Sequence, residues 1–262
     1  MLQDLFSMKD KVCVVTGGSR GLGRAMAEAY LKAGAARIYI TARKADACEQ
    51  AANELSSLTD QGECIAIPCN LSTTDEIERF ASAIAEREQA IDVLVNNAGA
   101  AWEAPLEQFP EQGWDKVMDL NTKTPFFLTQ KLLPLLKSAA STSGDASVIN
   151  TGSIAGIKGD SSNTFSYATS KAAVHQLTRN MAFALANDKV RVNAIAPGRF
   201  HSKMTEVFEN NKAVYNAEIK AIPLHRWGHD EDIMGIALLL ASRAGAFITG
   251  EIITVDGGTT LI

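Results

Sequence analysis

The chain has no long apolar run and no excess of basic charge, and each absence excludes a class of protein. The longest apolar stretch near the C-terminus, 236–241, is far too short to cross a bilayer, and residues 1–10 contain no apolar run suited to a signal peptide. The formal net charge of -5 argues against a general nucleic-acid binder, which would show a basic face. We therefore expect a protein that binds neither membranes nor nucleic acid.

Cysteine and histidine are also scarce, and their spacing is not typical of a metal site. The four cysteines are Cys13, Cys48, Cys64 and Cys69, and the four histidines are His175, His201, His225 and His229. The cysteines form no Cys-x-x-Cys pair and have no neighbouring histidine, so we expect no metal. Free thiols and a reducing cytoplasm fit this pattern, and the scattered histidines are expected in surface or packing positions.

What the chain does contain is a regular alternation of strand-like and helix-like segments. Short β-branched or apolar runs predict strands at 11–16, 37–41, 63–68, 91–96, 147–151, 190–195 and 251–255. Helical patterns lie at 22–32, 45–58, from 73 onward, and at 112–137, 165–186, 204–221 and 230–240. This alternation predicts an α/β fold in which helices cover both faces of a doubly wound, seven-stranded parallel sheet.

The domain organisation follows from the same alternation. No linker divides the chain, so we expect residues 1–262 to form one dinucleotide-binding catalytic domain. The segment 202–227 interrupts the regular pattern. It is expected to form a substrate cap over the carboxyl ends of the strands, where ligands bind in such sheets.

A glycine-rich stretch, Thr16–Gly23, joins the first predicted strand to the first predicted helix. Its glycines at 17, 21 and 23 form a G-x-x-x-G-x-G pattern. Glycine allows positive φ and lets a phosphate approach the backbone, and a helix N-terminus offers free N–H groups to a pyrophosphate. The pattern predicts a dinucleotide-binding loop, and the alternative is a tight turn without a ligand. The residues expected to contact the cofactor are Gly17, Ser19, Arg20, Gly21, Leu22 and Gly23.

The end of the second predicted strand favours NADP(H) over NAD(H). Ala42 stands where an acidic residue would bind the ribose hydroxyls, and Arg43 and Lys44 follow it. Without a carboxylate nothing repels a 2′-phosphate, which Arg43 can bind with its planar fork, and Arg20 adds a second cation. The alternative is that these cations are solvated surface charges.

Tyr167 and Lys171 form a Tyr-x-x-x-Lys pair on the predicted helix 165–186, and Ser153 lies upstream. One helical turn separates the pair, so both side chains can project from the same face. A free tyrosine titrates near pH ~10, and a neighbouring ammonium favours the phenolate. The pair predicts proton transfer to or from an alcohol, and the alternative is an ordinary helix surface.

Taken in order, these residues resemble the short-chain dehydrogenase/reductase family. The matching segments are Thr16–Gly23, Asn96–Gly99, Asn121, Ser153, Tyr167, Lys171, Pro197–Gly198 and Val255–Gly258. Within the family the chain looks most like the NADPH-dependent 3-oxoacyl reductases associated with rhamnolipid biosynthesis, through Pro197–Phe200, Ser202–Thr205 and Arg226–Gly228. The resemblance implies a Rossmann-type fold. It also implies reduction of a ketone, a 3-oxoacyl thioester or a related apolar ketone, to a secondary alcohol.

The resemblance also assigns a role to each catalytic candidate. Tyr167 would be the general acid in reduction and the base in oxidation. Lys171 would lower the pKa of Tyr167 and bind the nicotinamide ribose, while Ser153 would position and polarise the substrate carbonyl. Asn121, at an irregularity in its long helix, would hold a water that links Lys171 to solvent.

Further cofactor and substrate contacts follow from the same resemblance. The cofactor residues beyond the glycine loop would be Arg43, Lys44, Asn70, Leu71, Asn97, Ala98, Gly99, Tyr167, Lys171, Pro197, Gly198, Phe200 and Ser202. Candidates for an apolar substrate pocket are Trp102, Ile154, Ile157, Met204, Val207, Phe208 and Trp227, with core or subunit-contact positions as the alternative. Relatives are commonly homotetramers, so a homotetramer or homodimer is expected.

The sequence departs from the family pattern at two places, and two other functions remain as alternatives. Asn70 replaces the aspartate of many relatives, and the interval from Ser153 to Tyr167 is longer than usual, which enlarges the loop 156–163. One alternative function is a sugar, polyol or other secondary-alcohol dehydrogenase. The other is a non-catalytic NADP(H)-binding regulator, which the complete Asn–Ser–Tyr–Lys set disfavours.

Overall fold

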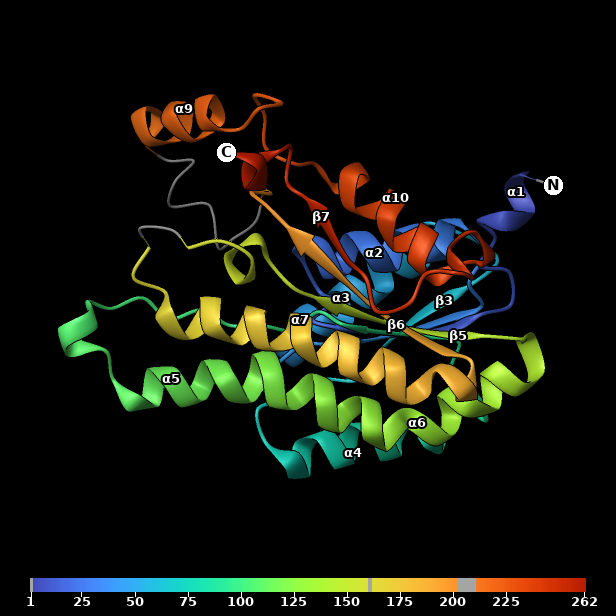
Figure 1. Ribbon diagram of the computed structural model, residues 1–262. Helices are drawn as coiled ribbons and strands as arrows, with labels where there is room; N and C mark the ends of the chain where they lie inside the picture. Colours follow the sequence, from blue (N-terminus) through green and yellow to red (C-terminus); the bar gives the residue numbers. More distant parts are fainter. Residues whose placement is uncertain (1, 160–161, 202–210) are drawn as a thin grey trace.

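The computed structural model describes residues 2–159, 162–201 and 211–262, and its centre is a parallel sheet (Figure 1). Within these residues seven strands pair in the order β3-β2-β1-β4-β5-β6-β7, and every pairing is parallel. The strands are β1 (Val12–Thr16), β2 (Arg37–Thr41), β3 (Glu63–Ala66), β4 (Val93–Asn96), β5 (Ala146–Thr151), β6 (Val190–Pro197) and β7 (Ile252–Val255). The predicted Rossmann-type sheet is therefore confirmed.

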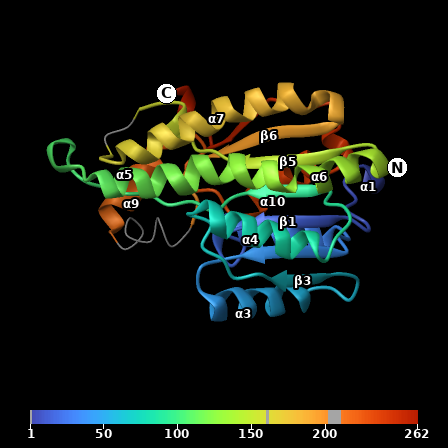
Figure 2. The same cartoon turned by 90° about the horizontal axis from the view of Figure 1, so that it is seen from below.

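Helices cover both faces of this sheet. One face carries α2 (Gly21–Lys32), α3 (Ala45–Ser56) and α10 (Asp230–Ala241), and the other carries α4 (Thr74–Ala85), α5 (Glu111–Met118), α6 (Thr124–Ser143) and α7 (Phe165–Leu185). Figure 2 shows α7, α6 and α4 side by side across the second face. A buried apolar cluster lies on each face because the strands of a doubly wound sheet are covered on both sides.

The long helix predicted at 112–137 is interrupted in its middle. Residues Asp119–Lys123 form a π-helical turn between α5 and α6, and Asn121 lies inside it. Pro125 falls in the first turn of α6, where its missing N–H is not needed. A π-turn inside an α-helix frequently marks a functional position, and this one is the irregularity expected at Asn121.

The remaining short helices connect or flank these layers. They are α1 (Leu2–Leu5), α9 (Lys212–Ala221) and the short turns η1 (Leu106–Gln108), η3 (Ile154–Gly156), η4 (Ala186–Asp188), η5 (Arg243–Gly245) and η6 (Thr259–Leu261). Helix α9 stands off the sheet near the ends of β6 and β7 (Figure 1). It is the described part of the predicted helix 204–221, because residues 202–210 lie outside the described residues. Among the described helices, none is long and apolar enough to span a membrane.

Because the strands are parallel, their carboxyl ends meet at one edge of the sheet. Thr16, Asn96, Thr151 and Pro197 are the last residues of β1, β4, β5 and β6. The strand order reverses between β1 and β4, and ligands of open α/β sheets bind in the crevice at such a point. The candidate site lies at this edge.

Candidate active site

The glycine loop between β1 and α2 has the backbone shape that its sequence predicts. Gly17 and Gly21 have φ values of 68° and 53°. A Cβ at Gly23 would lie 2.4 Å from the Asn97 amide nitrogen and 2.6 Å from the Gly17 carbonyl oxygen, so only glycine allows this close approach. No side chain caps the start of α2 at Arg20. The N–H groups of its first turn are therefore available to a pyrophosphate.

The Thr16 hydroxyl joins this loop to the turn after β4. It accepts hydrogen bonds from the backbone N–H groups of Asn97 and Ala98, both at 2.9 Å. The Asn97 side-chain amide donates in return to the carbonyl oxygens of Thr16 and Gly17, at 2.9 and 3.3 Å. Thr16 is 1% exposed, so these bonds are shielded from water. They fix the two loops that flank the predicted cofactor crevice.

The residues predicted to select the cofactor lie at the neighbouring end of β2. Ala42 follows the last residue of that strand and is half-buried, while Arg43, Lys44 and, in the glycine loop, Arg20 are exposed. Their exposure leaves the charges accessible to a phosphate group. After β3, the strand that pairs with β2, exposed Asn70 accepts a 3.0 Å hydrogen bond from the Ser72 hydroxyl.

Other predicted cofactor residues are in the same region but differ in exposure. Leu71 is 3% exposed, and its carbonyl oxygen accepts a 2.5 Å hydrogen bond from Thr124. Gly99 is exposed, and a Cβ there would lie 3.3 Å from the Asn121 side-chain oxygen and 3.8 Å from the Lys171 ammonium. The turn after β4 therefore lies directly against two of the catalytic candidates.

Helix α7 carries Lys171 in the buried centre of the site. Lys171 is 5% exposed, and its ammonium donates a 2.6 Å hydrogen bond to the Thr151 carbonyl oxygen at the end of β5. It lies 5.6 Å from the centre of the Tyr167 ring. Burial lowers the pKa of Lys171 to about 8. The amine is therefore still largely protonated at neutral pH.

The electrostatics of Tyr167 differ from the sequence prediction. Burial raises the pKa of Tyr167 above its ordinary value, and this outweighs the opposite effects of a hydrogen bond with Ser153 and of the Arg199 charge. The net shift is opposite to the one that a neighbouring ammonium alone would give, because burial outweighs the charges near the phenol. That Lys171 lowers this pKa stays a prediction. The phenol is therefore protonated at neutral pH, which is the form that a general acid requires.

Asn121 is anchored by its whole side-chain amide. Its oxygen accepts a 2.8 Å hydrogen bond from the Ala100 N–H, and its two N–H groups donate to the Ala100 carbonyl and the Ser170 hydroxyl, both at 2.9 Å. Asn121 is 2% exposed. The π-turn thus connects the loop after β4 to α7, and both amide donors are used by protein atoms. Its role in holding a water stays a prediction.

The segment after β6 closes the other side of the crevice. Gly198 packs so tightly on Asp256 that a Cβ would lie 2.8 Å from the Asp256 Cα. Phe200 is 5% exposed and pairs with Gly228 in an isolated parallel bridge. Arg199 forms a 3.0 Å ion pair with Glu218, which connects this segment to α9. Ser202, predicted to contact the cofactor, lies outside the described residues.

The residues predicted to line the substrate pocket have different environments. Trp102 packs over Gly113, where a Cβ would lie 2.7 Å from its ring, Ile154 is half-buried and Ile157 is 49% exposed. Trp227 is 1% exposed and packs against Tyr215, with ring centres 4.9 Å apart. Met204, Val207 and Phe208 lie outside the described residues. Trp227 is therefore a core residue here and exposes no face to a pocket.

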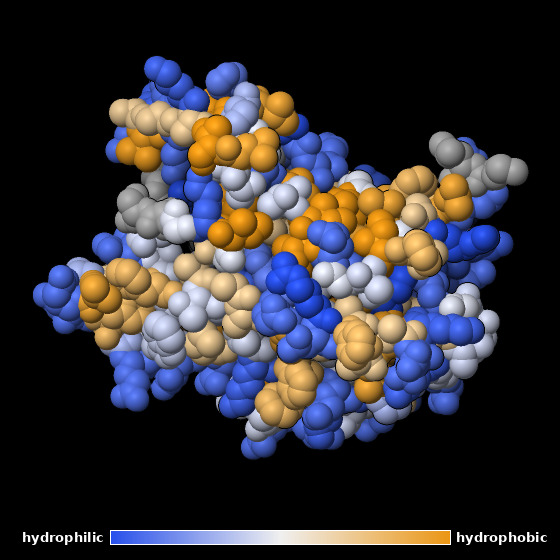
Figure 3. All heavy atoms as spheres, viewed as in Figure 1, coloured by the Kyte–Doolittle hydropathy of each residue, from blue (hydrophilic) through white to orange (hydrophobic). Residues whose placement is uncertain are grey.

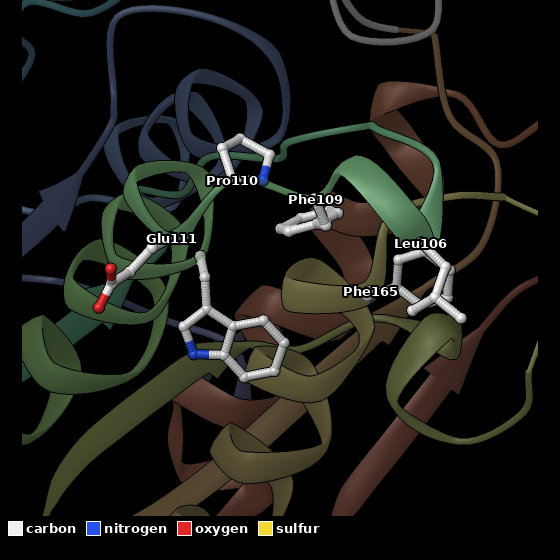
Figure 4. Close-up of a pocket in the computed structure, with 6 residues that line it drawn as sticks. Leu106, Phe109, Pro110, Glu111 and Phe165 are labelled. Atoms are coloured by element: carbon white, nitrogen blue, oxygen red, sulfur yellow. The ribbon is translucent and has the colours of Figure 1, made fainter.

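An apolar recess of about 300 Å³ lies at the start of α5 and α7 (Figure 4). Its lining residues are Leu106, Phe109, Pro110, Glu111, Trp114 and Phe165. The Phe109 ring meets Trp114 and Phe165 edge-on, with centres 6.4 and 5.8 Å apart. None of the residues predicted to form the substrate pocket belongs to this lining.

Sequence reasoning gave no role to several residues that the structure brings to the site. Thr16, Ser170 and Arg199 act through long-range contacts for which the sequence carries no local signal. His175 is 4% exposed and contacts the backbone of Ser153. His175 lies one helical turn after Lys171, on the same face of α7, and this spacing could have indicated from the sequence that it lies near the site.

Comparison with known proteins agrees with this arrangement. A family profile described as Enoyl-(Acyl carrier protein) reductase matches residues 17–260. The rhamnolipids biosynthesis 3-oxoacyl-[acyl-carrier-protein] reductase of Pseudomonas aeruginosa is 46% identical over 253 residues, which cover 97% of each chain. The 5-keto-D-gluconate 5-reductase of Escherichia coli is 34% identical over 260 residues, which cover 98% of each chain.

A solved structure extends this similarity to three dimensions. The Pseudomonas aeruginosa RhlG/NADP active-site complex matches with a TM-score of 0.93 and 45% identity, over 98% of each chain. The family profile covers nearly the whole chain, and the relative at 46% identity covers 97% of it, so both show the family. The chain belongs to the short-chain dehydrogenase/reductase family.

Proposed function

We propose that this protein uses NADPH to reduce a ketone to a secondary alcohol, and that the ketone is a 3-oxoacyl thioester or a related apolar ketone. The observation that carries the proposal is the position of Tyr167 beside Ser153 and one helical turn from Lys171, whose ammonium lies 5.6 Å from the centre of the phenol ring. The 46% identity to a 3-oxoacyl-[acyl-carrier-protein] reductase supports the substrate class.

The shape and charge of the crevice support NADP(H) as the cofactor. The glycine loop leaves the first turn of α2 uncapped by side chains, which suits a pyrophosphate. Arg43 and Arg20 are exposed beside it and would hold the 2′-phosphate, while Ala42 offers no competing carboxylate. The structural relative matched over 98% of this chain is a complex with NADP, which supports the same assignment.

The residues of the chain would act on the carbonyl oxygen of the substrate. NADPH, when bound, supplies the hydride. Tyr167 would donate its proton to the carbonyl oxygen, and Ser153 would hold that oxygen with a second hydrogen bond. Both bonds strengthen as the oxygen becomes alkoxide-like, so they lower the barrier to reaction and do more than tighten binding. Lys171 would bind the nicotinamide ribose, and Asn121 would keep the loop after β4 against α7.

The proposal is tested by NADPH oxidation with a panel of 3-oxoacyl thioesters, cyclic ketones and keto-sugars. We expect the highest kcat/KM with a 3-oxoacyl thioester and a clear preference for NADPH over NADH. An enzyme that reduces none of the panel with either cofactor would contradict the proposal.

A sugar or polyol dehydrogenase is the second candidate function. It is favoured by the 34% identity to a 5-keto-D-gluconate 5-reductase over nearly the full chain. The same panel separates the two candidates, because a preference for keto-sugars over thioesters by tenfold or more in kcat/KM would favour the second.

The assembly and organisation of the protein are part of the proposal. We infer a single catalytic domain, with the 202–227 segment as its cap, that forms a homotetramer or homodimer. Exposed apolar side chains on the two long helices support self-association, with Phe126 on α6 40% exposed and Phe183 on α7 90% exposed. Apolar side chains also gather over α10 on the face shown in Figure 3. Light scattering in solution would test the assembly.

The location proposed for the protein is the cytoplasm. All four cysteines are free and buried, which suits a reducing compartment. Fractionation of the producing cell would test this location. Recovery of the protein in the fraction of an oxidising compartment would contradict it.

A further inference from the structure

His175 lies behind the loop that carries Ser153. It belongs to α7, one helical turn after Lys171, and is 4% exposed. Its Nε2 atom accepts a 3.4 Å hydrogen bond from the backbone N–H of Ser153. It also forms a hydrogen bond with the backbone of Gly156. The imidazole thus connects both ends of the η3 turn, whose first residue follows Ser153.

Two glycines give the imidazole its place against this turn. A Cβ at Gly152 would lie 2.3 Å from His175 Nε2, and a Cβ at Gly156 would lie 3.0 Å from its Cε1. Neither glycine has a positive φ, so close packing and not backbone strain is what keeps both small. The loop therefore fits against the ring on both sides of Ser153, and its position depends on the ring.

The hydrogen bonds define which nitrogen carries the proton. Because Nε2 accepts from Ser153, the proton must be on Nδ1, which donates to the Gly156 carbonyl. Burial, followed by the charges of Lys171 and Arg179, lowers the pKa of His175 to about 4. The loop residues that bind the ring, Ser153 and Gly156, contribute backbone groups. His175 is therefore a neutral acceptor at neutral pH.

The Ser153 hydroxyl depends on this anchor because His175 binds the backbone that carries it. Its oxygen accepts a 3.2 Å hydrogen bond from the Ala155 N–H within the same turn. The contact with His175 holds the Ser153 backbone against α7, the helix that bears Tyr167 and Lys171. A shift of about 1 Å in a positioning group can cost ~100-fold in rate.

We propose that His175 is a positioning residue for ketone reduction, which holds the Ser153 hydroxyl at the carbonyl through the backbone of the Ser153–Gly156 turn. The proposal rests on the function proposed above. His175 touches neither the substrate nor the cofactor in this assignment, and it acts through Ser153.

The first test is a double-mutant cycle with Ser153→Ala. His175→Leu removes the acceptor at similar volume, and we expect it to lower kcat about 10- to 100-fold while NADPH affinity changes less than about twofold. His175→Gln, whose amide oxygen can accept from Ser153, should retain most of the kcat. In the Ser153→Ala background, His175→Leu should cost less than about twofold further. Gln176→Leu, on the exposed side of α7, is the matched control.

An equal loss of kcat from His175→Leu with and without the Ser153 hydroxyl would overturn the proposal, and so would wild-type kcat in His175→Leu. The second test needs no folded Leu variant. Nitrogen-15 NMR of the four histidines, assigned with His175→Gln, should show a neutral ring protonated at Nδ1 at pH 7. A ring protonated at Nε2 would contradict the geometry. If the wild type reduced no ketone, the proposed function would fail, and this NMR result would still decide the hydrogen-bond arrangement.

Discussion

The Lys171 ammonium lies 5.6 Å from the centre of the Tyr167 ring while it donates a 2.6 Å hydrogen bond to the Thr151 carbonyl oxygen. The cation is therefore held over the ring of the phenol by a backbone carbonyl at the end of β5. Burial dominates the electrostatics of both residues, raising the pKa of Tyr167 and lowering that of Lys171 to about 8. The phenol is therefore protonated at neutral pH, which is the form that donates a proton in the reduction of a ketone.

The buried lysine predicts how stability depends on pH. Unfolded Lys171 titrates near pH ~10.4, and the folded residue near pH 8. Between these values the unfolded chain binds more protons, so the free energy of unfolding gains a term that rises with pH. We predict that the cofactor-free protein gains up to about 3 kcal/mol relative to Lys171→Met between pH 7 and pH 10.5.

Urea unfolding of both proteins across this pH range measures the difference. Lys32→Met, which removes an exposed lysine ion-paired to Glu28, is the control for general effects of pH on the chain. If the gap between wild type and Lys171→Met stayed constant from pH 7 to pH 10.5, the lysine would not have the buried environment described here.

Thr16 and Thr41 are paired in register on β1 and β2, and they predict opposite effects of the same substitution. Each is 1% exposed. Thr16→Val would leave the N–H groups of Asn97 and Ala98 without their acceptor, so we predict a loss of about 1–3 kcal/mol in unfolding free energy and weaker NADPH binding. The Thr41 hydroxyl has no hydrogen-bond partner within the described residues. We therefore expect Thr41→Val to be neutral or stabilising.

Denaturant unfolding and NADPH titration of the two valine variants test this contrast. Equal destabilisation by both substitutions would show that the hydroxyl of Thr16 has no special role in joining the two loops.

The end of β2 predicts the choice of cofactor. The double variant Ala42→Asp with Arg43→Ala adds a carboxylate and removes an exposed guanidinium, so it should weaken NADPH binding by about 10- to 100-fold relative to NADH. Fluorescence titration with both cofactors measures the two dissociation constants. Unchanged relative affinities would assign the 2′-phosphate to other residues.

The sequence predicted the parts of this molecule that depend on local pattern. The strand and helix alternation predicted the parallel sheet, and the glycine spacing predicted the loop in which Gly17 and Gly21 have positive φ. Tyr167 and Lys171 could be paired because a helix repeats its face after one turn. These features need only residues that are close along the chain.

The remaining features depend on contacts between distant parts of the chain. The bond from Asn97 to Thr16 spans 81 residues, and no local pattern indicates it. The direction of the Tyr167 pKa shift depends on how deeply the fold buries the phenol, which its spacing from Lys171 cannot tell. Trp227 was expected either in a pocket or in the core, because a large apolar residue suits both, and the fold buries it against Tyr215.

Steady-state NADPH oxidation by wild type and Tyr167→Phe with a 3-oxoacyl thioester, with NADPH affinity measured on the same samples, tests the central claim most directly. If Tyr167 is the proton donor, the variant should lose about 10²- to 10⁴-fold in kcat while its NADPH dissociation constant stays within about twofold of wild type. Full turnover by the folded variant would contradict the account.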